Sequence, residues 1–276
     1  MFLLSNAWRR GKRASDQPLP MPPMPRRDPL LEALIAEERV GLLFQPQIVP
    51  GSGRIAGAEA LARWDGATPE RLFARAAASG LSERLSRLLQ RKALRSAAAW
   101  EGPLKSLGIS INLLPEDVAR PHYEDWLLEE IDRVAIDPRR VTVEITEGGL
   151  LADRAGASER LARLREQGIK IAVDDFGTGY SSLAYLTSLP LDTLKIDRGL
   201  IADIVGGSRD RIVVKAMIQL ARELDLTVVI EGVESAAQLA LLSEWGCDLY
   251  QGFLGAEALD ELELARFVAA AHAEAA

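Results

Sequence analysis

The chain has 276 residues, of which 48% are apolar, with 33 Lys and Arg against 40 Asp and Glu. This composition is typical of a folded globular protein, and the net charge of −7 argues against binding of a nucleic-acid polymer as its main function. Its 2 histidines and 1 cysteine are too few for a zinc centre or an internal disulfide, so we expect a reducing, cytoplasmic setting.

Residues 1–27 differ in composition from the rest of the chain. They hold six basic residues, one acidic residue and five prolines, which is typical of a flexible arm. The apolar start at Met1–Leu4 is too short for a secretory signal and precedes the positive charges. We therefore expect a basic, Pro-rich arm at 1–27, either without a contact or docked on a protein or membrane surface, and one folded domain at 28–276.

From residue 28 onward, short β-branched runs alternate with amphipathic segments, which is typical of an α/β fold with a mostly parallel sheet. Helical patterns fall at 83–100, 157–167, 210–224 and 236–245. Eight strands are expected, at 42–48, 55–63, 107–113, 141–146, 169–174, 193–196, 227–231 and 248–254. Eight strands with helices between them in about 250 residues favour one closed TIM-type (β/α)8 barrel over two domains.

The first two expected strands are joined by only six residues, 49–54, whereas a parallel crossover needs about a dozen or more. They should form an antiparallel hairpin, which gives the barrel an antiparallel first strand. A turn centred near Ser52 would pair Gln45 with Glu59.

Each expected strand carries a polar residue at or near one end. These residues are Gln45, Glu59, Asn112, Glu144, Asp174, Lys195, Glu231 and Gln251. A buried, unpaired carboxylate is costly in free energy, so a ring of them needs a counter-charge. Strand ends converge at the carboxyl-terminal mouth of a barrel, where barrel enzymes have their active sites.

The kinds of side chain in this ring indicate that metal ions supply the counter-charge. Besides the amide of Asn112 there are five carboxylates, those of Glu59, Glu144, Asp174, Asp175 and Glu231. Such hard oxygen ligands select Mg²⁺ or Mn²⁺, and the adjacent Asp174 and Asp175 suit two ions about 4 Å apart, as in two-metal phosphoester hydrolysis. Ca²⁺ should inhibit, because its coordination is looser and its ligand distances are longer.

Two cations accompany the acidic ring and suit a phosphate-containing substrate. Arg63 could grip a phosphate oxygen, while Lys195 could orient water or stabilise developing charge. A Gly-rich loop follows the acidic pair, with the residues Phe176, Gly177, Thr178, Gly179, Tyr180, Ser181 and Ser182. Its spacing is not that of a Walker loop, and the other protein-kinase motifs are missing, so it favours a lid or an interface loop.

In these residues the chain resembles the EAL family of bacterial cyclic di-GMP phosphodiesterases, over roughly 31–259. Eight motifs stand in family order: Phe44-Gln45-Pro46, Glu59-Ala60-Leu61 with Arg63, Ile111-Asn112-Leu113, Glu144-Ile145-Thr146-Glu147, 174–183, 194–198, Glu231-Gly232-Val233-Glu234 and Gln251-Gly252-Phe253. The printed sequence carries no recognisable cyclase or sensor domain, so we expect a stand-alone EAL domain.

The resemblance implies that water cleaves cyclic di-GMP to linear 5′-pGpG at two metal ions. It implies a first ion on Glu59, Asn112, Glu144 and Asp174, and a second on Asp174, Asp175 and Glu231. Glu231 and Lys195 are then the pair that activates and positions the water. Nucleotide contacts are implied for Gln45, Leu61, Arg63 and Gln251. Coupling of the site to a homodimer interface is implied for Glu147 and the loop from Phe176 to Ser182.

The chain departs from the family pattern in two places. Ala76-Ala77-Ala78 stands where an acidic run is usual, and Gly255 and Ala258 stand where an aromatic residue and a proline are usual. None of these replaces an expected metal ligand, so we expect intact chemistry with altered lid packing or regulation. The alternatives are a catalytically silent cyclic di-GMP receptor, an interaction module docked through the arm, and a different metal-dependent barrel enzyme such as an enolase-type proton abstractor.

Overall fold

The computed structural model describes residues 27–64, 68–146, 154–177, 183–207 and 209–274. Apart from Arg27, the arm expected at 1–27 lies outside the described residues. Among the described residues, no helix combines the length and the apolar character that a membrane span requires.

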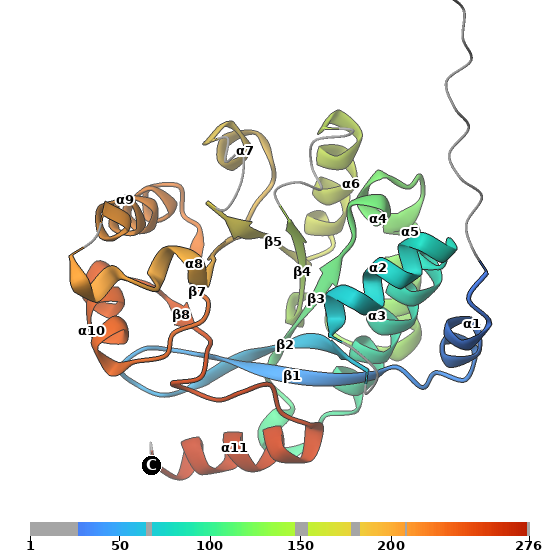
Figure 1. Ribbon diagram of the computed structural model, residues 1–276, viewed down its shortest axis with the longest axis horizontal. Helices are drawn as coiled ribbons and strands as arrows, with labels where there is room; N and C mark the ends of the chain where they lie inside the picture. Colours follow the sequence, from blue (N-terminus) through green and yellow to red (C-terminus); the bar gives the residue numbers. More distant parts are fainter. Residues whose placement is uncertain (1–26, 65–67, 147–153, 178–182, 208, 275–276) are drawn as a thin grey trace, which may run out of the picture.

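Eight strands close into one barrel in chain order, which confirms the predicted TIM-type architecture (Figure 1). The strands are β1 (Gly41–Ile48), β2 (Ile55–Arg63), β3 (Gly108–Leu113), β4 (Val141–Thr146), β5 (Lys170–Phe176), β6 (Thr193–Ile196), β7 (Thr227–Ile230) and β8 (Leu249–Tyr250). Neighbours from β2 to β8 are parallel, so their carboxyl ends share one end of the barrel. We call that end the mouth.

The first strand runs against both of its neighbours, as the short connection predicted. β1 pairs antiparallel with β2 and with β8. Gln45 lies opposite Glu59, which confirms the register expected from a turn near Ser52. Directly paired residues share a face of the sheet, so Gln45 lies on the same side of the barrel wall as Glu59.

The last strand is shorter than predicted. The sequence predicts a strand over 248–254, whereas β8 ends at Tyr250. The backbone turns away at Gly252, where φ is +145° and a Cβ would lie 2.3 Å from the amide nitrogen of Val233. Only glycine allows this close approach of two backbones, so the strand cannot continue to residue 254.

Helices surround the barrel (Figure 1). They are α1 (Pro29–Ala36), α2 (Pro69–Ser79), α3 (Ser82–Ala99), α4 (Pro115–Ala119), α5 (Tyr123–Val134), α6 (Arg154–Glu166), α7 (Leu183–Ser188), α8 (Arg198–Ile201), α9 (Arg209–Glu223), α10 (Ala236–Trp245) and α11 (Glu261–Glu274), with 3-10 turns η1 (Gly102–Leu104), η2 (Pro138–Arg140) and η4 (Ile204–Gly206). The four helices predicted from periodicity correspond to α3, α6, α9 and α10.

The core lies between the strands and these helices. Strand residues such as Ile109 and Val143 are buried with Leu127 of α5 in one large apolar cluster. A second cluster joins Leu31 of α1, Leu72 of α2 and Leu85 of α3. Because apolar side chains fill the outer face of the wall, the polar residues of the strands are directed into the barrel.

Candidate active site

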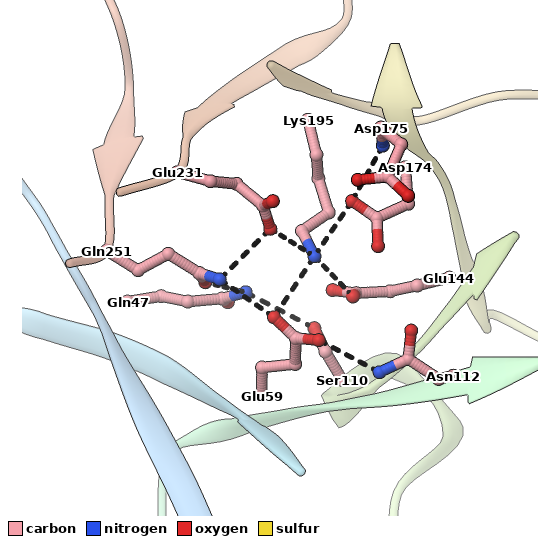
Figure 2. A network of polar contacts seen from close by, with 10 residues as sticks. All are labelled: Gln47, Glu59, Ser110, Asn112, Glu144, Asp174, Asp175, Lys195, Glu231 and Gln251. Carbon is pink, nitrogen blue, oxygen red and sulfur yellow. Dashed lines mark hydrogen bonds and ion pairs between the residues drawn. The ribbon is translucent and has the colours of Figure 1, made fainter. Parts of the chain in front are cut away.

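The polar residues of the strand ends meet inside the mouth of the barrel. Figure 2 shows these side chains gathered around the ammonium of Lys195 of β6, and they come from β2, β3, β4 and β5 and from the residues that follow β7 and β8. The residues brought together are Glu59, Asn112, Glu144, Asp174, Asp175, Lys195, Glu231 and Gln251. The polar strand-end residues predicted from the sequence, except Gln45, therefore form one cluster.

Lys195 lies at the centre of the cluster and is fully buried. Its Nζ is 2.6 Å from Glu144 Oε2 and 2.7 Å from Glu231 Oε1. It also lies 3.1 Å from Glu59 Oε2 and 3.1 Å from Asp174 Oδ1. One ammonium therefore contacts four carboxylates whose side chains are at most 17% exposed, so water solvates them poorly.

The charges in this cluster shift one another's pKa values. Burial opposes ionisation of Glu59, but the Lys195 charge and hydrogen bonds from Gln251 and Asn112 outweigh it and lower the pKa of Glu59. Burial and the Glu59 charge hold the pKa of Glu144 well above its ordinary value. Burial raises the pKa of Glu231 to about 8, with Lys195 opposing the shift. The surrounding carboxylates raise the pKa of Lys195 well above its ordinary value against the effect of burial, so the amine stays charged.

Carboxylate oxygens form two groups that share Asp174. In one group Glu59, Glu144 and Asp174 each offer an oxygen, all within 4.8 Å of one another, and in the other Asp174, Asp175 and Glu231 do the same. All these donors are oxygens, which suits Mg²⁺ or Mn²⁺. Five carboxylates against one ammonium leave four excess negative charges if all are ionised, and two divalent cations would cancel them. The residues therefore fit a pair of ions.

A break in β5 allows two consecutive carboxylates to serve one site. Successive side chains of a regular strand point to opposite faces, so Asp174 and Asp175 would normally diverge. The pairing of β5 with β6 shifts register between Val173 and Phe176, and Asp175 has a positive φ of 55°. Asp tolerates this left-handed conformation better than most residues, and the irregularity directs both carboxylates to the cluster (Figure 2).

Gln251 supports two of the carboxylates. Its Nε2 donates to Glu59 Oε2 at 2.8 Å and to Glu231 Oε1 at 3.0 Å, and the residue is 3% exposed. Gln47 Nε2 in turn donates to Gln251 Oε1 at 3.4 Å and to Ser110 Oγ at 3.5 Å. Neither Gln47 nor Ser110 is among the site residues predicted from the sequence. Each lies two residues from a predicted site residue on the same strand, and the two-residue period of strands could have found both.

Three further predicted residues lie around the cluster. Gln45 is half-buried on β1 opposite Glu59. Leu61 lines a mostly apolar cavity of about 280 Å³ that α2, α3, β2 and β3 enclose, with Asn112 in its wall. Arg63 is the exposed last residue of β2. None of the three is part of the polar network drawn in Figure 2.

The loop residues are described only in part. Phe176 is buried at the end of β5, and Gly177 has a φ of +103°. A Cβ on Gly177 would lie 2.4 Å from Leu200 Cδ1, so the loop begins in tight contact with α8. Glu147, Thr178, Gly179, Tyr180, Ser181 and Ser182 lie outside the described residues.

Comparisons with known proteins identify the family of this chain. The model of the EAL domain family matches residues 27–258. The cyclic di-GMP phosphodiesterase NbdA of Pseudomonas aeruginosa is 34% identical over 252 residues, which are 89% of this chain and 32% of that protein. The curated relatives that the chain matches are longer, and it spans about a third of their length.

Two solved structures share the fold. The PaMucR phosphodiesterase in its c-di-GMP complex has a TM-score of 0.79 and 33% identity, covering 84% of this chain and 97% of that one. Klebsiella pneumoniae BlrP1 in a manganese and cy-diGMP complex has a TM-score of 0.70 and 32% identity, covering 78% of this chain and 55% of that one. The match of the family model over most of the chain shows that the chain belongs to the EAL domain family.

Proposed function

We propose that this chain is a metal-dependent phosphodiesterase that hydrolyses cyclic di-GMP to linear 5′-pGpG. The observation that carries the proposal is the pair of carboxylate groups joined by Asp174 inside the mouth of the barrel. The names of its relative NbdA and of the PaMucR complex support the choice of substrate.

Two ions would share the carboxylates. Glu59, Asn112, Glu144 and Asp174 would hold the first ion, and Asp174, Asp175 and Glu231 the second. Bound Mg²⁺ or Mn²⁺ would neutralise phosphate charge and lower the pKa of a water molecule. Asn112 already donates from Nδ2 to Glu59 Oε1 at 2.8 Å, which places its amide beside the first group.

Glu231 and Lys195 would handle the attacking water. Glu231 is the most accessible of the carboxylates that contact Lys195, with a side chain 17% exposed, and it accepts the water proton. Lys195 holds Glu231 in place at 2.7 Å. Attack forms a new P–O bond and breaks the bond from phosphorus to the 3′ oxygen. The 3′ oxygen takes up one proton, equivalent to the one that Glu231 accepts from the water, so the products are a 5′-phosphate and a 3′-hydroxyl.

Other residues would bind the nucleotide. Arg63 would contact a phosphate oxygen, and Gln45 and Gln251 would contact the nucleotide from the barrel wall. The apolar cavity beside Leu61 suits a flat base better than a charged group. Because Gln251 also donates to Glu59 and Glu231, it would orient those two carboxylates at the same time.

The test is incubation of the purified protein with cyclic di-GMP and Mg²⁺ or Mn²⁺, followed by chromatography of the nucleotides. Metal-dependent formation of pGpG that a chelator abolishes is the expected result, and Glu59→Ala should show no turnover. Binding without product would favour the silent receptor. Near-normal turnover by Glu59→Ala at saturating metal would refute the assignment of that ligand.

The proposal includes a homodimer in the cytoplasm. The Gly-rich loop begins against Leu200 of α8 and Met217 of α9, and α9 exposes Ile212 and Val213 with fractions of 72% and 45%. These two exposed apolar side chains lie on the helix that the loop contacts through Met217, which supports coupling between an interface on α9 and the site. The free thiol of Cys247 supports a reducing compartment. Light scattering should report a dimer for the native chain and a monomer for Ile212→Glu.

A further inference from the structure

A buried polar cluster outside the metal-binding ring lies against the main chain of Asn112. It consists of Ser86 and Gln90 of α3, Asp117 of α4 and Tyr123 of α5, whose exposed fractions are 3%, 2%, 0% and 1%. Four polar residues at this depth would lower the free energy of unfolding unless they satisfied one another. One hydrogen bond of this cluster is made to the main-chain oxygen of Asn112 in the site.

Gln90 makes the contact with the site. Its Nε2 lies 3.1 Å from the main-chain oxygen of Asn112, 2.9 Å from Ser86 Oγ and 3.3 Å from Asp117 Oδ2. Main-chain and carboxylate oxygens only accept hydrogen bonds, so the nitrogen of the amide must face them. On the other side, the Tyr123 hydroxyl donates to Gln90 Oε1 at 2.8 Å. The amide is therefore held from both ends.

Asp117 holds the cluster together. Its Oδ2 accepts from Ser86 Oγ at 2.5 Å and from the amide nitrogen of Leu114 at 3.1 Å, and Arg120 pairs with Oδ1 at 3.0 Å. Burial and then the Asp117 charge raise the pKa of Tyr123, so its hydroxyl stays protonated and can donate. The anchor for Gln90 therefore joins α3, α4 and α5.

We propose that Gln90 is a positioning residue that fixes the end of β3 so that the Asn112 side chain meets Glu59. The contacts run from Tyr123 through Gln90 to the Asn112 main chain, and from the Asn112 amide to Glu59 Oε1 at 2.8 Å. The inference rests on the proposed function, because it treats Asn112 and Glu59 as metal ligands.

The variant Gln90→Met keeps the length and volume of the side chain but removes the amide. Mn²⁺ binding is measured without substrate, from the loss of the free-ion signal in electron paramagnetic resonance. Loss of partners behind the ligands typically weakens metal binding by about 10-fold to 100-fold, so we expect at least a tenfold weaker affinity. Hydrolysis should fall at limiting Mn²⁺ and recover at saturating Mn²⁺, because every ligand is still present.

Lys92→Met is the matched control. Lys92 lies on the same helix and also donates to main-chain oxygens, those of Glu38 at 2.9 Å and Val40 at 2.7 Å, away from β3. It should lower the melting temperature without changing the Mn²⁺ affinity. A destabilised variant that keeps native Mn²⁺ affinity shows that a general loss of stability does not by itself weaken metal binding, so the weaker affinity expected of Gln90→Met can be assigned to its contact with Asn112.

The outcomes separate this inference from the proposed function. If the native protein binds Mn²⁺ and folded Gln90→Met binds it with the same affinity, Gln90 does not position Asn112, and the metal site is unaffected. A native chain that binds no Mn²⁺ would overturn both. If Gln90→Met does not fold, the same titration on Gln90→Leu decides between these results.

Discussion

The ammonium of Lys195 lies 2.6 Å from the carboxylate of Glu144, and each side chain is 1% exposed. Removal of one partner from such a pair leaves an uncompensated buried charge. We therefore expect Lys195→Met to lower the free energy of unfolding of the metal-free protein by about 3–5 kcal/mol. The measurement is urea denaturation in a chelator.

Mn²⁺ should restore part of the stability lost in Lys195→Met, because the ion replaces the missing positive charge, but turnover should stay low. The exposed Lys170 of β5 provides a matched control, since Lys170→Met removes the same charge outside the cluster. A stability loss in Lys195→Met no larger than in Lys170→Met would contradict the structural role of the central ammonium.

Metal binding should depend on pH through Glu231. Burial raises its pKa from 4.5 to about 8, so the folded, metal-free protein keeps a proton that the unfolded chain releases. This group therefore destabilises the metal-free protein progressively as the pH rises from about 4.5 towards 8. A bound cation displaces the proton, so the increase in melting temperature caused by Mg²⁺ should grow from pH 6 to pH 8.

Glu231→Gln tests the source of that pH dependence, because an amide has no proton to release in this range. Thermal melts with Mg²⁺ or chelator at several pH values provide the comparison. In Glu231→Gln the increase in melting temperature caused by Mg²⁺ should change less with pH than in the native chain. If it changes as steeply as in the native chain, another group causes the pH dependence.

Asp175→Asn separates charge from backbone strain. Burial and then the Asp174 charge raise the pKa of Asp175, so loss of its charge should stabilise the metal-free protein. Asn tolerates the left-handed conformation at this position, whereas Ala costs about 1–2 kcal/mol there. In chelator, we expect Asp175→Asn to melt above the native chain and Asp175→Ala to melt below Asp175→Asn. Both should bind Mn²⁺ more weakly.

Ca²⁺ should bind and inhibit. Its oxygen ligands lie at about 2.3–2.6 Å against about 2.0–2.1 Å for Mg²⁺, so two Ca²⁺ ions would fit a pair of groups sharing Asp174 less well. Addition of Ca²⁺ to the Mg²⁺ enzyme should lower the rate of pGpG formation. Turnover with Ca²⁺ alone at the Mg²⁺ rate would contradict the argument.

Sequence patterns over short stretches of the chain predicted much of the fold and of the polar cluster around Lys195. The short link at 49–54 predicted the antiparallel β1 and its Gln45–Glu59 register, because connection length limits topology. Polar residues in apolar strands predicted the convergence of Glu144, Asp174 and Lys195, because burial of such groups has to be compensated. These features depend on a few neighbouring residues.

Features that arise from long-range packing could not be predicted. The bulge that turns Asp175 towards Asp174 depends on how β5 pairs with β6. Gly255 lies so close to β1 that a Cβ would be 2.4 Å from Ile48 Cδ1, a contact between residues far apart in the chain. The Gln90 cluster joins segments that have no pattern in common. Each needs contacts between residues far apart in the chain.

The reversed direction of β1 decides where the two ends of the domain attach. Gly41 pairs with Arg63, so the chain enters the barrel at the mouth, whereas in an all-parallel barrel it would enter at the base. Helix α11 contacts η1, which precedes β3 and lies at the base. A segment joined before α1 is thus connected to the end of the barrel that holds the carboxylates, and a segment joined after α11 to the opposite end. Inputs from the two termini would reach the chemistry by different routes, a short one through β1 and a long one through the barrel wall.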